Sequence, residues 1–93
     1  KINNYSIDLN SREICINDIN LKLTEKEVNT IVYLSKKNVP ETIEELEKNV
    51  WQYQSDIETH TVETHIYRLR QKISKTFKDK TFILSKKNGY QIK

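Results

Sequence analysis

The sequence has only one cysteine, one glycine and one proline in 93 residues, and it has no methionine. The lone Cys15 cannot form a disulfide within the chain, which fits a reducing cytosol. We interpret Cys15 as half-buried filler of a strand and not as a nucleophile. A chain with one glycine cannot build a glycine-rich phosphate loop, so nucleotide hydrolysis by that route is excluded.

Long apolar runs are also missing. The longest, residues 31–34, is four residues long, so no segment can span a membrane. There is no signal-peptide pattern, and we expect a cytoplasmic protein. Hydrophobic residues make up only 35% of the chain, but they recur periodically, which indicates one folded domain. The chain starts at Lys1 without a methionine, which indicates a piece, the C-terminal part, of a longer protein.

No residue pattern predicts catalysis, a metal or a cofactor. His60 and His65 are five residues apart, about 140° around a helix, so they do not converge on one metal. Acidic residues such as Glu27 and Glu45 fall in the first turns of expected helices, where the helix dipole favours them. We therefore expect a binding protein and not an enzyme.

The first 23 residues predict a small antiparallel β-meander. Residues 5–9 alternate apolar and polar side chains, and short strands are expected again at 13–16 and 19–23. Turn-forming pairs separate them at residues 10–11 and 17–18.

Two capped helices follow the expected meander. Thr24 and Glu27 form a capping box at the first helix start, and Pro40 prevents that helix from continuing. Thr42 and Glu45 repeat the box for a second helix, which should end near Trp51.

A third helix is expected from about Thr59 to Lys75. Its apolar residues at i, i+4, i+7 and i+11 form one narrow stripe: Val62, Ile66, Leu69 and Ile73. The opposite face carries hydrogen-bond donors and positive charge, as a helix in a DNA major groove requires. Taken alone, the same pattern describes an ordinary amphipathic surface helix.

Positive charge is concentrated in the last third of the chain. Residues 1–58 have a net charge of −4, whereas residues 59–93 have a net charge of +7. A basic surface beside an acidic body is typical of phosphate-backbone binding.

The C-terminus predicts a β-hairpin. Residues 82–85 and 90–92 are the expected strands, Asn88-Gly89 is the expected turn, and Lys86 and Lys87 place two cations at its tip. Three helices followed by a cationic hairpin predict an α+β winged helix-turn-helix, with a meander (about 1–23), a three-helix unit (24–75) and a wing (76–93). A plain hairpin that closes the domain is the alternative.

Five motifs in order resemble one family: residues 23–27, 44–46, 50–51, 61–72 and 89–90. They are similar to the effector domain of OmpR/PhoB-type response regulators, which has a winged-helix fold with an N-terminal meander. The resemblance covers essentially the whole chain. It implies sequence-specific double-stranded DNA binding for transcriptional regulation, commonly by dimers on tandem half-sites, with a receiver domain upstream.

The resemblance and the helical face together divide the candidate site into four groups. Base edges are assigned to Thr64, Tyr67, Arg68 and Gln71. Phosphates are assigned to Trp51, His60, Thr61, His65, Arg70, Lys72 and Lys75. The wing comprises Lys86, Lys87, Asn88, Gly89 and Tyr90. A loop that can touch RNA polymerase comprises Gln52, Tyr53, Gln54, Ser55, Asp56, Ile57 and Glu58.

The wing departs from the family pattern. Lys86 replaces the usual arginine and Lys87 replaces a glycine, so the charge stays but the planar guanidinium fork is lost. Thr64 and Tyr67 are also unusual at groove-facing positions, so the target sequence does not transfer from relatives. A second interpretation is a protein-interaction winged helix whose basic face meets an acidic partner.

Overall fold

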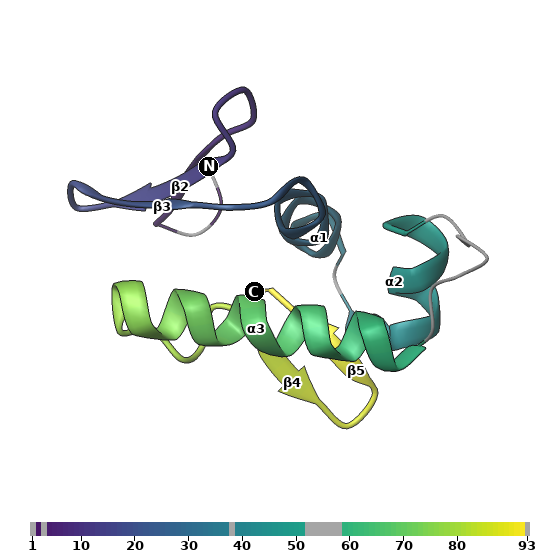
Figure 1. Ribbon diagram of the computed structural model, residues 1–93. Helices are drawn as coiled ribbons and strands as arrows, with labels where there is room; N and C mark the ends of the chain where they lie inside the picture. Colours follow the sequence, from purple (N-terminus) through teal and green to yellow (C-terminus); the bar gives the residue numbers. More distant parts are fainter. Residues whose placement is uncertain (1, 3, 38, 52–58, 93) are drawn as a thin grey trace.

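The computed structural model describes residues 2, 4–37, 39–51 and 59–92, without the side chains of Thr59 and His60. The elements in order are β1 (Ser6–Asp8), β2 (Glu13–Ile16), β3 (Ile19–Lys22), α1 (Glu25–Ser35), α2 (Ile43–Asn49), α3 (Thr59–Phe77), β4 (Leu84–Lys86) and β5 (Gly89–Gln91). In Figure 1, α3 crosses the molecule, with the meander and α1 on one side and the β4–β5 hairpin on the other. This is the predicted winged-helix architecture.

The meander is antiparallel in the order β1-β2-β3. Ile16 pairs with Ile19, so Asn17 and Asp18 form a two-residue turn, and both have positive φ (50° and 68°) as a type I′ turn requires. Asparagine and aspartate tolerate this backbone conformation better than most residues, which is why the predicted turn forms here.

The two faces of the meander differ. Ile7, Ile14 and Leu21 are aligned across the three strands, and Ile14 is completely buried. Cys15 lies on the other face and is partly exposed, in agreement with its interpretation as half-buried filler.

Helix caps place α1 and α2. The backbone N–H of Glu27 donates to Thr24 Oγ1 (3.2 Å) and the N–H of Thr24 donates to Glu27 Oε1 (2.8 Å), which confirms the first capping box. At α2, the N–H of Glu45 donates to Thr42 Oγ1 (3.1 Å). The hydrogen bonds of the described residues do not include the return bond, in which the Thr42 N–H would donate to the Glu45 carboxylate, so only half of the second box is present.

The core collects apolar side chains from the meander, all three helices and the C-terminal segment. Val62, Ile66, Leu69 and Ile73 are at most 1% exposed, which confirms the predicted stripe on α3. The other buried apolar residues are Tyr5, Ile14, Leu23, Val28, Ile31, Leu34, Leu46, Val50, Trp51, Phe82, Ile83 and Ile92.

Tyr5 attaches the N-terminus to the segment that follows α3. Its ring packs against Phe77 and Phe82, with centroids 5.1 and 4.6 Å away, and its hydroxyl donates to Asp79 Oδ2 at 2.6 Å. Burial, with the Asp79 carboxylate, raises the pKa of Tyr5, while the bond from Tyr5 lowers the pKa of Asp79. The shared proton therefore stays on Tyr5.

The hairpin differs from the prediction at its turn. Lys86 pairs with Gly89, so Lys87 and Asn88 form the two-residue loop and Gly89 begins the returning strand. The first strand also starts later than expected, at Leu84. Phe82, which precedes the strand, is 2% exposed and belongs to the core.

Glu41 explains why residue 89 is glycine. The backbone of Glu41 exchanges hydrogen bonds with Tyr90 (2.8 and 2.9 Å), and a Cβ on Gly89 would lie 2.1 Å from the Glu41 carbonyl oxygen. The Tyr33 hydroxyl donates to the Glu41 carboxylate, and burial raises the pKa of Tyr33 to about 12, with a further contribution from Glu41. Glu41 is therefore held between α1, through Tyr33, and β5, through Tyr90.

We expect Gly89→Ala to lower the free energy of unfolding by about 1–3 kcal/mol, because Gly89 has φ 138° and the new Cβ would meet the Glu41 carbonyl. Urea denaturation measures this loss. The neighbouring variant Asn88→Ala, at an exposed loop position, should change stability by less than about 0.5 kcal/mol. Equal stability of the two variants would contradict the close packing of residue 41 against β5.

Candidate nucleic-acid interface

The outward face of α3 brings the four expected base-reading residues together. Tyr67 is 58% exposed, Arg68 and Gln71 are also exposed, and Thr64 is half-buried. They recur every three or four residues opposite the buried stripe, so packing of the stripe turns them toward solvent. Gln71 Nε2 donates to the Tyr67 hydroxyl oxygen at 2.9 Å.

A hollow of about 280 Å³ lies along this face towards the C-terminal end of α3. The residues that line it are Tyr67, Arg70, Gln71, Ser74, Lys75 and Lys80. None of these is acidic, and Lys75 and Lys80 are exposed. Sequence reasoning missed Lys80, because it follows the helix and helical periodicity carries no information about it.

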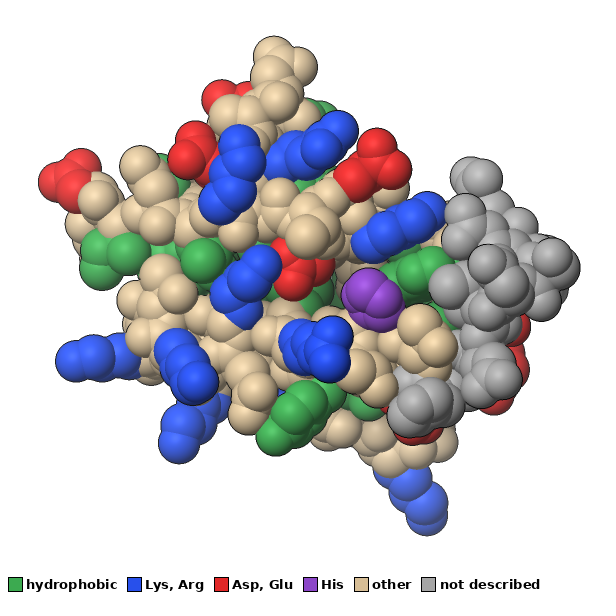
Figure 2. Space-filling model, viewed as in Figure 1, with side chains coloured by type: hydrophobic (Ala, Val, Ile, Leu, Met, Phe, Trp, Pro, Cys, Tyr) green, Lys and Arg blue, Asp and Glu red, His purple; other side chains and the backbone are tan. Residues whose placement is uncertain are grey.

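The charge is distributed unevenly over the face that Figure 2 shows. Lys and Arg side chains gather along α3 and on the hairpin side of it, whereas most of the Asp and Glu side chains lie towards the meander and α1. Residues 59–93, whose net charge is +7, include α3 and the hairpin.

The wing residues lie beside the start of α2. Lys86, Lys87 and Asn88 are exposed, and Tyr90 is half-buried. A second hollow, of about 340 Å³, separates the wing from α2 and is also lined by Glu44 and Glu63. The cations at the tip are exposed, and the carboxylates of Glu44 and Glu63 bound the positive surface on that side.

Trp51, which was expected to contact a phosphate, is almost completely buried. Its side chain is 2% exposed, and its ring packs against the His65 ring at a centroid distance of 5.6 Å. His65 and Thr61 are half-buried and keep part of their surface. Trp51 therefore belongs to the core and packs against His65.

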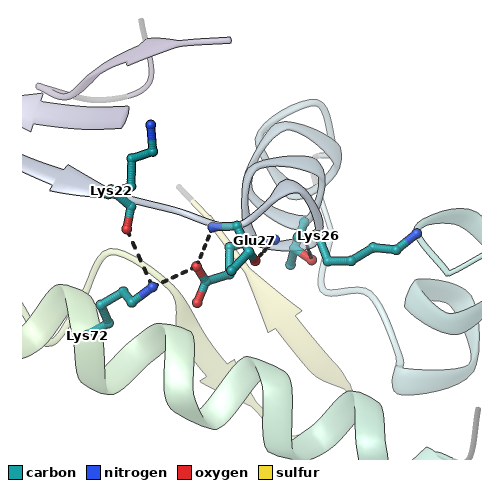
Figure 3. Close-up of polar contacts among 6 residues, drawn as sticks. Lys22, Lys26, Glu27 and Lys72 are labelled. Atoms are coloured by element: carbon teal, nitrogen blue, oxygen red, sulfur yellow. Dashed lines mark hydrogen bonds and ion pairs between the residues drawn. The ribbon is translucent and has the colours of Figure 1, made fainter. Parts of the chain in front are cut away.

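Two of the expected phosphate-binding cations are engaged within the protein. Arg70 Nε donates to the Ile83 carbonyl oxygen at 3.2 Å and so attaches α3 to the segment before β4. Lys72 Nζ lies 2.8 Å from Glu27 Oε1 and 3.4 Å from the Lys22 carbonyl oxygen (Figure 3). Both side chains extend from the flanks of α3. At such positions, helical periodicity does not predict whether a side chain meets solvent or another part of the protein.

Glu27 connects the elements that hold α3. Its Oε1 accepts from both Lys72 and the backbone N–H of Thr24, and the residue is 8% exposed. The next side chain in sequence, Lys26, points the other way (Figure 3). Its Nζ donates to the Val50 carbonyl oxygen at 3.2 Å. The first turn of α1 thus holds α3 on one side and the end of α2 on the other.

Part of the predicted site lies outside the described residues. This applies to the whole loop of residues 52–58, which was expected to touch RNA polymerase, and to the side chain of His60. Over the described ranges there is no group of three or more His, Cys, Asp or Glu side chains that could hold a metal. No described helix combines the length and apolar character needed to cross a membrane.

A comparison with protein families agrees with both the fold and the sequence motifs. Residues 18–92 match the family described as "Transcriptional regulatory protein, C terminal". The chain belongs to this family. The match covers α1, α2, α3 and the wing, and it agrees with the resemblance to response-regulator effector domains that the sequence motifs carry.

Individual proteins of this group are similar along nearly the whole chain. Response regulator ArlR of Staphylococcus aureus is 30% identical over 93 residues, which are 99% of this chain and 42% of ArlR. The DNA-binding domain of Escherichia coli CadC superposes with a TM-score of 0.85 at 22% identity, over 100% of this chain and 89% of CadC's. The DNA-binding domain of response regulator AdeR, solved with an intercistronic region, has a TM-score of 0.81 at 24% identity, covering 99% and 96%. The chain thus spans less than half the length of ArlR.

We expect Glu27→Ala to lower the free energy of unfolding by about 2–3 kcal/mol, because it removes both a helix cap and the partner of Lys72. Lys72→Met keeps the aliphatic stem and the cap, so its loss should be smaller, about 1 kcal/mol. The control Arg12→Ala breaks an exposed ion pair of 3.6 Å with Glu25. Its effect should be below about 0.5 kcal/mol by urea denaturation. A Glu27→Ala loss no larger than that of the control would contradict the bridging role.

Proposed function

We propose that this domain binds double-stranded DNA sequence-specifically, with the outward face of α3 in the major groove and the wing on the flanking backbone. One observation carries the proposal. The apolar stripe of α3 is at most 1% exposed, while the opposite face presents exposed Tyr67, Arg68, Gln71 and Lys75 to solvent. A helix that is fixed by burial on one side and polar on the other can enter a groove without rearrangement.

The contacts within the protein refine the proposed roles. Thr64, Tyr67, Arg68 and Gln71 are proposed to read base edges. Thr61, His65, Lys75 and Lys80 are proposed to contact phosphates, together with the wing residues Lys86 and Lys87. Trp51, Arg70 and Lys72 are proposed to position α3 and not to touch DNA, because their side chains are buried or engaged with protein atoms.

The relatives favour a role in two-component signalling. ArlR is a response regulator, and the AdeR domain was solved with an intercistronic region. We therefore propose an effector domain in a bacterial cytoplasmic regulator, with a receiver domain upstream, dimeric binding to tandem half-sites and a loop of residues 52–58 that contacts RNA polymerase.

Salt dependence of duplex binding tests the electrostatic part of this proposal. Neutralisation of about five phosphates predicts a slope of about −4.5 when log K is plotted against log salt concentration. Fluorescence anisotropy with duplexes selected from genomic fragments gives this slope. A flat response, or no sequence-selective retention of fragments, would favour the protein-interaction interpretation instead.

Variants separate base reading from phosphate binding. Arg68→Ala should weaken the selected duplex by about 1–3 kcal/mol and relax the preference at one base pair. The control Lys86→Ala should reduce affinity evenly across sequences and make the salt slope shallower by about 1. An even loss on all sequences for Arg68→Ala would contradict its assignment to a base edge.

A further inference from the structure

Tyr67 and Gln71 are joined by a hydrogen bond on the open face of α3. They are four residues apart, so they lie on the same side of the helix, and both are exposed. Gln71 Nε2 donates to the Tyr67 hydroxyl oxygen at 2.9 Å. The bond connects two side chains that would otherwise move independently, and it fixes which polar atoms remain available to a ligand.

The direction of this bond leaves the Tyr67 hydroxyl as a donor and Gln71 with one N–H donor and one acceptor. The tyrosine oxygen accepts from Gln71, so the Tyr67 O–H proton is free to be donated elsewhere. One of the two N–H groups of Gln71 Nε2 is used by Tyr67, which leaves the other N–H as a donor and Oε1 as the acceptor of that side chain. The pair therefore presents a neighbouring donor and acceptor to whatever lies against this face.

We propose that Tyr67 and Gln71 act as one unit that reads an adenine in the major groove. This inference rests on the proposed function. Adenine presents the N7 acceptor beside the N6 amino donor on this edge. The Tyr67 hydroxyl donates to N7, and Gln71 Oε1 accepts from N6. Guanine presents two acceptors and so offers no donor to Gln71 Oε1, and cytosine and thymine present one polar group each. Of the four bases, only adenine offers a partner to both the Tyr67 O–H and Gln71 Oε1.

The surface around Tyr67 and Gln71 is positively charged, which suits a base that is flanked by phosphates. The hollow of about 280 Å³ beside it is also lined by Lys75 and Lys80 and by no acidic residue. Cations on this rim attract the phosphates that flank a base, which brings the base edge to the pair but carries no sequence information. Affinity from the lysines and selectivity from the pair are therefore separable by mutation.

The first test is selection of bound duplexes from a random library. Wild type should enrich adenine at one position, and Tyr67→Phe and Gln71→Ala should both relax that same position. The control Lys75→Ala should keep the preference and bind all duplexes more weakly. Relaxation at two different positions, or at none while selective binding persists, would overturn the shared role of Tyr67 and Gln71.

Base analogues then test each contact in the selected duplex. Replacement of the adenine by 7-deazaadenine removes N7 and should weaken wild type about 5- to 50-fold, but should not weaken Tyr67→Phe further. Replacement by unsubstituted purine removes the N6 amino group and should weaken wild type similarly, but not Gln71→Ala. Equal sensitivity of wild type and the matching variant would overturn the assignment.

The outcomes distinguish this inference from the proposed function. If wild type retains no duplex selectively, DNA reading by this domain is itself contradicted. If selective retention persists and the analogues have no effect on wild type, only the adenine unit is contradicted. Thermal melting of each variant confirms that the exposed substitutions leave the fold intact.

Discussion

Burial of four side chains on α3 determines how the rest of the molecule is presented. Val62, Ile66, Leu69 and Ile73 are at most 1% exposed, and each large apolar side chain contributes roughly 1.5–3 kcal/mol when it is buried. A hydrogen bond contributes about 0.5–1.5 kcal/mol net, so no single polar contact competes with the stripe in setting the rotation of α3. Because rotation about the helix axis is fixed in this way, the polar face is directed outward before any ligand arrives.

The buried stripe sets the rotation of α3 about its axis. Polar contacts also set the position of the helix along and across that axis. Lys72 is held by Glu27 at the start of α1, and Arg70 holds the segment that leads into the wing. Tyr5 and Asp79 connect the meander to the segment after α3. These contacts engage two cations within the protein, and they keep α3 and the wing in one arrangement. This arrangement lets the outward face and the wing meet one duplex together, as proposed above.

The sequence predicted those features that depend on local periodicity and on capping chemistry. The α3 stripe, the Thr24–Glu27 box and the Asn17-Asp18 turn follow from residues that are close together in the sequence. The misses depend on contacts between distant segments. Gly89 is required by the backbone of residue 41 and not by the turn, and Lys72 meets a carboxylate 45 positions away. Trp51 belongs to the core because of how α2 meets α3, which no local pattern encodes.

The central claim is that the outward face of α3 and the wing together form the DNA surface. Backbone amide NMR spectra recorded during titration with a selected duplex test it most directly. We expect the largest shifts at Thr64, Tyr67, Arg68, Gln71 and Lys75 and at the hairpin tip, with the solvent-facing side of the meander around Cys15 and Asn20 unchanged. Shifts concentrated on the meander, with α3 unaffected, would contradict the account.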